Sequence, residues 1–303
     1  LTGTVVDYGQ VHSAIYKHSR FGTDFRSKPL ITGWGQKDAD GNVKKLNFMG
    51  HSFGGATIRL LSELLVYGSV REIKGTAPDS ISNLFTGGKT GWIHSITALA
   101  SPHNGTTMTN LSKPVSFLLP KDGEKIVGVT NESSIAIINY LKNLAKLFKN
   151  GIGEDTGIYD LTLDGAARLN IKLSTFSDIY YFSFPTDSTT SVLHSNNRAP
   201  NLKLNSVVLL PICTFMGSNK GKTPGGIVYD KSWFNNDGIV NTVSTLAPKN
   251  APQRDFDANS VTPGVWHIMP LFKGDHMSIT GGLTHAVDVK DFYVDHINLI
   301  NSK

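Results

Sequence analysis

The segment Gly50-His51-Ser52-Phe53-Gly54 contains the residue types and spacing in this 303-residue chain that point most directly to chemistry. It fits G-x-S-x-G, a pattern typical of a nucleophilic serine held on a sharp turn between a strand and a helix. Residues 45–49 have the composition of a short strand, and residues 54–65 that of a mostly apolar, buried helix. The flanks therefore favour this interpretation over an ordinary glycine-rich turn.

The turn has physical requirements that the motif meets. Gly50 and Gly54 are small, and we expect them to let the strand and the helix approach closely. The turn would place the Ser52 hydroxyl at the helix N-terminus, where the Phe53 N–H can stabilise a developing oxyanion.

A nucleophilic serine also needs a base and an acid that orients the base. In α/β-hydrolases, whose nucleophile elbow has this pattern, the partners follow in the order Ser, Asp/Glu, His. His276 fits the base best, because it lies on a glycine-containing loop between an expected strand and the last expected helix. Asp237, on an Asn/Gly-rich loop, is the best acid, although the pattern alone fits a surface aspartate equally well. Asp275 is adjacent to His276, and neighbouring side chains usually point apart.

Four of the six remaining histidines after the elbow are weaker candidates for the base because of their positions. Two precede the expected position, one falls in an expected strand and one in the expected last helix: His94, His103, His267 and His296.

Composition excludes several classes of protein. The chain is 39% hydrophobic and 17% charged, with a net charge of +5 but no dense run of Lys and Arg, so a mildly basic surface is favoured over nucleic-acid binding. No apolar run approaches the roughly 18 residues of a membrane span. The single cysteine, Cys213, lies in an apolar run and is expected to be buried.

The remaining elements are expected to form one α/β domain over residues 1–303. Strands are predicted at 93–100, 179–184, 207–212 and 265–270, and helices at 10–20 and 289–300. Residues 101–107 would form a turn at the carboxyl edge of a parallel sheet, where such sheets bind ligands. Residues 108–175 read as a helical insertion, and the apolar periodicity of residues 135–148 fits a lid over an apolar site or a helix packed on the core.

With these residues in place, the chain resembles the thermoalkalophilic-type bacterial lipases of Geobacillus and Staphylococcus and the related clostridial esterases and polyesterases. The resemblance spans nearly the whole chain. It is carried by residues 4–9, His12, His18, residues 20–22, Gly50-His51-Ser52, residues 98–107, Tyr159-Asp160-Leu161, residues 236–244 and Asp275-His276.

The resemblance implies an α/β-hydrolase fold, with a mostly parallel sheet, helices on both faces and a helical lid or zinc-binding insertion. It implies that Ser52, Asp237 and His276 are nucleophile, orienting acid and base. The expected activity is hydrolysis of carboxylic esters such as triacylglycerols at an oil–water or polymer interface, with possible polyester hydrolysis. Acyl transfer by the same triad, a decayed binding module and a zinc hydrolase are the alternatives. The resemblance also implies a secreted protein.

The family carries a structural zinc ion held by two histidines and two aspartates. By resemblance, His12, His18 and Asp160 match three of these ligands, a donor set that suits four-coordinate zinc. The fourth ligand and the second oxyanion N–H are expected upstream of Leu1. A calcium site found in relatives is doubtful here, because the residues that follow His276 offer no carboxylate before Asp288.

Overall fold

The computed structural model describes residues 1–111, 153–282 and 287–303. Its central feature is a five-stranded sheet whose neighbouring strands are all parallel. From one edge to the other, the strands are β11 (Gln253–Asp255), β12 (Trp266–Ile268), β5 (Tyr180–Phe184), β4 (Ile93–Leu99) and β3 (Leu46–His51). The prediction of a mostly parallel central sheet is confirmed.

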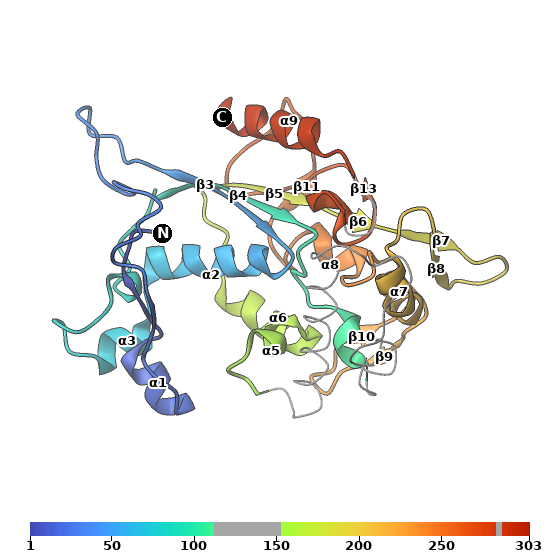
Figure 1. Cartoon of the computed structure of the whole chain (residues 1–303), viewed down its shortest axis with the longest axis horizontal. Coiled ribbons are helices and arrows are strands. Elements are labelled where there is room, and N and C mark those ends of the chain that lie inside the picture. Colours follow the sequence, from blue (N-terminus) through green and yellow to red (C-terminus); the bar gives the residue numbers. More distant parts are fainter. Residues whose placement is uncertain (112–152, 283–286) are drawn as a thin grey trace.

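Helices lie on both faces of this sheet (Figure 1). The elbow helix α2 (Phe53–Tyr67) covers one face, and α9 (Lys290–Asn301) covers the other. Strand β4 contributes to both cores because alternate side chains of a strand point to opposite faces. Ile96 and Ala98 pack in the cluster that contains residues of α2, whereas Leu99 packs in the cluster that contains Ile300 of α9. Each large apolar side chain buried in this way contributes about 1.5–3 kcal/mol.

Shorter elements surround this core. Among the described residues, the other helices are α1 (Gln10–Tyr16), α3 (Val70–Gly75), α5 (Gly157–Leu161), α6 (Leu163–Lys172), α7 (Leu210–Met216) and α8 (Thr242–Leu246). Four two-stranded ribbons pair β1 (Val5–Asp7) with β2 (Phe21–Asp24), β6 (Thr186–Asp187) with β13 (Phe272–Lys273), β7 (Thr189–Ser191) with β8 (Arg198–Pro200), and β9 (Gly221–Lys222) with β10 (Val228–Tyr229).

Two predicted elements differ in the structure. Residues 207–212 are not a strand: Val207–Leu209 forms a 3-10 turn that leads into α7. A short apolar run does not distinguish a strand from a buried helix, and Pro211 sits where a helix start tolerates proline. The first helix ends at Tyr16 rather than at residue 20, because Lys17 adopts the left-handed conformation at φ 59°.

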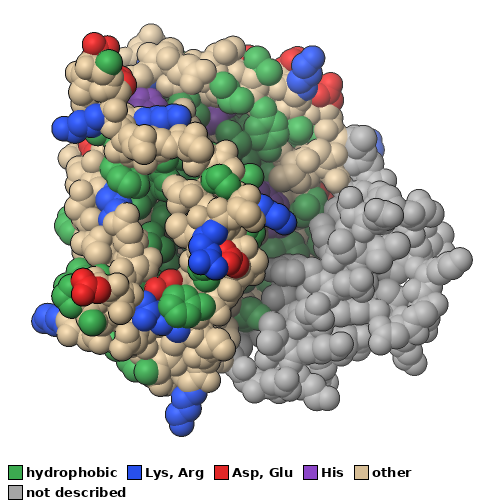
Figure 2. Space-filling model, turned by 60° about the vertical axis from the view of Figure 1, so that its left-hand side comes forward, with side chains coloured by type: hydrophobic (Ala, Val, Ile, Leu, Met, Phe, Trp, Pro, Cys, Tyr) green, Lys and Arg blue, Asp and Glu red, His purple; other side chains and the backbone are tan. Residues whose placement is uncertain are grey.

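The helix predicted over residues 135–148, either a lid or a helix packed on the core, lies outside the described residues. In the part of the chain that is described, no helix is long and apolar enough to cross a membrane. On the face shown in Figure 2, basic and acidic side chains are interspersed rather than gathered into patches of one sign.

Candidate active site

The predicted strand–turn–helix around Ser52 is present. β3 ends at His51, α2 begins at Phe53, and Ser52 between them has φ 56° and ψ −131°. A positive φ is strained for a residue with a side chain, and such strain is concentrated at functional sites. The backbone N–H of Ser52 donates to the carbonyl of Leu99 on β4 (2.8 Å), which fixes the turn to the sheet. The Ser52 hydroxyl makes no capping hydrogen bond to α2, so capping does not occupy it.

The close approach of strand and helix depends on two glycines, of which only Gly50 was predicted. A Cβ on Gly50 would lie 2.5 Å from the backbone carbon of Gly54, and a Cβ on Gly55 would clash with the side chain of Ser101. A Cβ on Gly54 would meet no atom within 4 Å. The expectation that Gly54 must be small for packing is therefore wrong, and Gly55 has that role.

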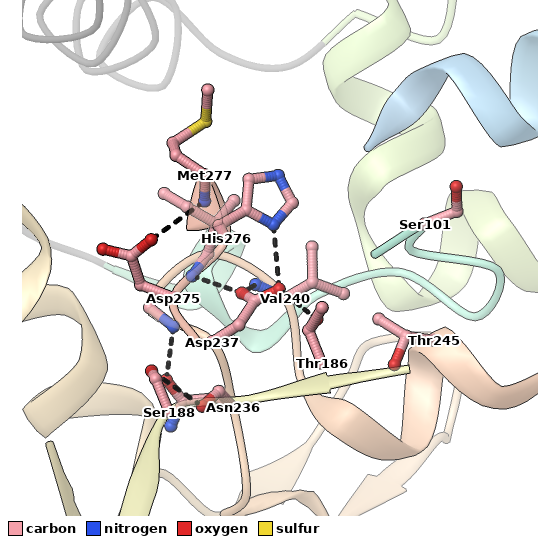
Figure 3. Close-up of polar contacts among 12 residues, drawn as sticks. Ser101, Thr186, Ser188, Asn236, Asp237, Val240, Thr245, Asp275, His276 and Met277 are labelled. Carbon is pink, nitrogen blue, oxygen red and sulfur yellow. Dashed lines mark hydrogen bonds and ion pairs between the residues drawn. The ribbon is translucent and has the colours of Figure 1, made fainter. Parts of the chain in front are cut away.

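His276 and Asp237 lie at hydrogen-bonding distance, although they come from separate loops (Figure 3). Nδ1 of His276 is 2.9 Å from Oδ2 of Asp237. The side chain of Asp237 is fully buried and that of His276 is 5% exposed. Since a carboxylate only accepts hydrogen bonds, Nδ1 carries the proton. Nε2 is then the basic nitrogen, and within the described residues it has no hydrogen-bond partner.

The Asp237 carboxylate is kept ionised by its surroundings. Oδ2 also accepts a hydrogen bond from the hydroxyl of Thr186 (2.6 Å), and Oδ1 accepts from the N–H groups of Ile239 (3.0 Å) and Val240 (2.7 Å). Burial alone would raise the pKa of Asp237, but the charge of His276 and these hydrogen bonds outweigh burial and lower it. Thr186 is the first residue of β6. No sequence signal marks it for this role.

Asp275 is not the partner of His276. Its carboxylate points away from the imidazole (Figure 3) and accepts backbone N–H bonds from Ser206 (2.7 Å), Met277 (3.1 Å) and Ser278 (2.9 Å). It therefore shapes the loop that carries His276. As predicted, the neighbouring side chains of Asp275 and His276 point apart.

The elbow and the His276 loop are in direct contact through His51, the residue before Ser52. Nε2 of His51 is 2.8 Å from the carbonyl oxygen of His276, and the two ring centroids are 4.6 Å apart. A hydrogen bond between Ser52 and His276 is not among the contacts of the described residues. Such bonds are often long until substrate is bound.

A second polar group is formed by His12 of α1, by His18 just after this helix and by Asp155. Nε2 of His12 is 3.0 Å from Oδ1 of Asp155, and Nε2 of His18 is 3.5 Å from Oδ2. The ligand atoms of these three residues lie within 4.8 Å of one another. Two imidazoles and a carboxylate are a donor set that zinc accepts, so these residues could hold such an ion.

Asp160 is not part of this group, contrary to the sequence prediction. It lies on α5, where burial raises the pKa of its carboxyl group. Asp155 precedes that helix on an exposed segment and reaches α1 instead. The resemblance pointed to the segment that contains both aspartates, which are five residues apart in the sequence.

The chain is similar in sequence and in structure to known bacterial proteins. The chain is 32% identical over 321 residues to a lipase from Staphylococcus hyicus, an alignment that covers 100% of the chain and 47% of that protein. It thus spans about half the length of the curated relatives it matches. Its structure resembles EstA from Clostridium botulinum (TM-score 0.81, 27% identity, 100% of this chain and 73% of that one) and lipase 1 from Pelosinus fermentans (TM-score 0.76, 33% identity, 99% and 82%).

These likenesses confirm the predicted fold class, an α/β-hydrolase fold, and the predicted resemblance. The family described as "Lipase-like, C-terminal domain" matches residues 1–114 and 108–300, which together cover nearly all of the sequence. The chain therefore belongs to the lipase-like C-terminal domain family.

Proposed function

We propose that this protein is a serine ester hydrolase of the lipase or esterase type, in which Ser52, His276 and Asp237 form the catalytic triad. The observation that carries the proposal is the buried 2.9 Å contact between His276 and Asp237, beside a strained serine at a strand-to-helix turn. Two of the similar proteins are named lipases and a third is named EstA. These names support the same reaction class.

The chemistry follows from the positions of the side chains. Nε2 of His276 takes the proton of the Ser52 hydroxyl, and the serine oxygen attacks the ester carbonyl. The Phe53 N–H, at the first position of α2, has no acceptor within its own helix and faces the oxyanion. His276 then protonates the leaving alcohol and activates the water that releases the acid, while Asp237 stabilises the imidazolium.

The substrate class that we propose is an acyl ester such as a triacylglycerol, presented at an oil–water interface. Hydrolysis of polyesters uses the same steps and is a narrower form of the same proposal. Secretion and a single domain over residues 1–303 also stay predictions.

We further propose that His12, His18 and Asp155 hold a structural zinc ion. The group ties α1 to the segment before α5 and takes no part in ester cleavage. It would stabilise the fold, because metal binding to a site that exists only in the folded state adds to folding free energy.

Hydrolysis of p-nitrophenyl butyrate tests the proposed function. Ser52→Ala should lower kcat to the background rate, whereas Ser218→Ala, on an exposed position after α7, should match the wild type. Equal rates in the wild type and Ser52→Ala would refute the assignment. Added alcohols distinguish acyl transfer, since an acyltransferase would give esters as its main product.

A further inference from the structure

His51 makes a contact that the triad alone does not require. It is the last residue of β3 and is directly followed by Ser52. Its Nε2 lies 2.8 Å from the backbone carbonyl oxygen of His276. A carbonyl oxygen only accepts hydrogen bonds, so Nε2 of His51 carries the proton and donates.

This bond completes the support of the His276 backbone. The N–H of His276 donates to the carbonyl of Asp237 (2.8 Å), and its ring donates to the Asp237 carboxylate (2.9 Å). Both of these bonds fix His276 to the loop of the acid. The bond from His51 is the one that fixes it to the strand that carries the nucleophile.

We infer that His51 is a positioning residue, which sets the separation of Ser52 and His276 by donating to the His276 carbonyl. The inference rests on the proposed function, because it assigns a role within that triad. Small displacements matter at such a site: a misplacement of about 1 Å can cost about 100-fold in rate.

The charge state of His51 suits this role. Burial is the main cause that lowers the pKa of His51 to about 4, and the charge of the nearby His276 lowers it further. The hydrogen bond to the His276 carbonyl and the charge of Asp237 oppose this shift with smaller effects. His51 is therefore neutral near pH 7. A neutral donor can fix the carbonyl without opposing the positive charge that His276 acquires when it takes the Ser52 proton.

A packing role is the competing explanation, because the two rings are in contact at 4.6 Å between centroids. Two variants of nearly equal length and shape separate these roles. His51→Gln keeps an N–H donor at similar reach, whereas His51→Met has no donor. His51→Phe adds a variant that keeps the ring. His94→Phe, near the amino-terminal end of the neighbouring strand β4 and so far along the strands from His51, controls for loss of a histidine.

The readout is kcat and KM for p-nitrophenyl butyrate, with unfolding temperatures measured on the same samples. We expect His51→Met and His51→Phe to lose about 10- to 100-fold in kcat with KM within about twofold, and His51→Gln to recover at least tenfold over His51→Met. Equal kcat values in His51→Gln and His51→Met would overturn the inference. Failure of the proposed function would give a different result, because Ser52→Ala would then hydrolyse the ester at the wild-type rate.

Discussion

Nδ1 of His276 and Oδ2 of Asp237 lie 2.9 Å apart in a region from which solvent is excluded. This pair links the loop before α8 to the loop after β13, and the contact fixes both the tautomer and the orientation of the imidazole. The ionised acid is held by three further hydrogen bonds from Thr186, Ile239 and Val240. The site is therefore organised before any substrate arrives.

Replacing the acid should disable the base. In Asp237→Asn, the amide can donate to Nδ1 and so favour the tautomer whose proton is on Nε2, which cannot accept the serine proton. We expect kcat for p-nitrophenyl butyrate to fall on the order of 10⁴-fold. Asp230→Asn, which changes an exposed aspartate nearby in sequence, is the control. A loss of less than tenfold in Asp237→Asn would show that another group orients His276.

The two glycines after Ser52 should differ in their tolerance of a methyl group. Gly55→Ala forces a Cβ into Ser101 and against Ala98, and overpacking of this kind costs about 1–3 kcal/mol. Gly54→Ala meets open space in a helix and should be neutral or stabilise by up to about 1 kcal/mol. Urea unfolding measures both free energies. Equal stabilities of the two variants would contradict the packing described for the elbow.

Zinc should stabilise the protein through Asp155 rather than Asp160. At a free zinc concentration of 100 times Kd, the free energy of unfolding should rise by about 2.7 kcal/mol, as measured by thermal unfolding of metal-free and zinc-loaded protein. Asp155→Asn should abolish most of this gain, and Asp160→Asn should retain it. The reverse order would restore Asp160 as the ligand. Chelation that stops ester hydrolysis in protein that is still folded would instead indicate a catalytic ion.

Stability should fall on mild acidification, in part because of His296. This side chain is buried between α9 and the sheet, where its Nε2 is 2.7 Å from the Thr97 hydroxyl. Burial lowers its pKa from 6.5 to about 4. Below pH 6.5 the unfolded chain therefore binds a proton that the folded protein does not, so this contribution to stability is complete above pH 6.5 and is lost as pH falls toward 4.

The size of this effect is at most about 1.4 kcal/mol per pH unit. His296→Gln should reduce the slope of unfolding free energy between pH 6.5 and 4.5 by on the order of 1 kcal/mol per unit. His194→Asn, at an exposed position of the β7–β8 hairpin, should leave the slope unchanged. An unaltered slope in His296→Gln would mean that this histidine is not held neutral in the folded protein.

The sequence was most informative where the backbone itself imposes a pattern. The elbow needs a strand, a tight turn and a helix in immediate succession, so local composition predicts all three, and β3, α2 and the strained Ser52 are found where expected. Chain order and loop composition selected His276, but they left Asp237 no better than a surface aspartate until the resemblance favoured it. The structure brings these two residues together.

Contacts made across long sequence distances were not predictable in the same way. Thr186 lies 51 residues from Asp237, and His51 lies 225 residues from His276, so no local pattern connects them. Asp155 precedes α5 and Asp160 lies on it, so the choice between them depends on how this segment approaches α1, which local composition does not record. The mistaken strand at 207–212 has a similar cause, because an apolar run records burial without specifying the geometry of the backbone.

Covalent labelling by a fluorophosphonate tests the central claim most directly, because the reagent reacts only with a serine that is activated as a nucleophile. Peptide mass spectrometry should find one adduct, on Ser52, and the labelling rate should fall by at least about 100-fold in His276→Ala and in Asp237→Asn. Labelling at another serine, or an unchanged rate at Ser52 in both variants, would contradict the assignment of these three residues as one catalytic unit.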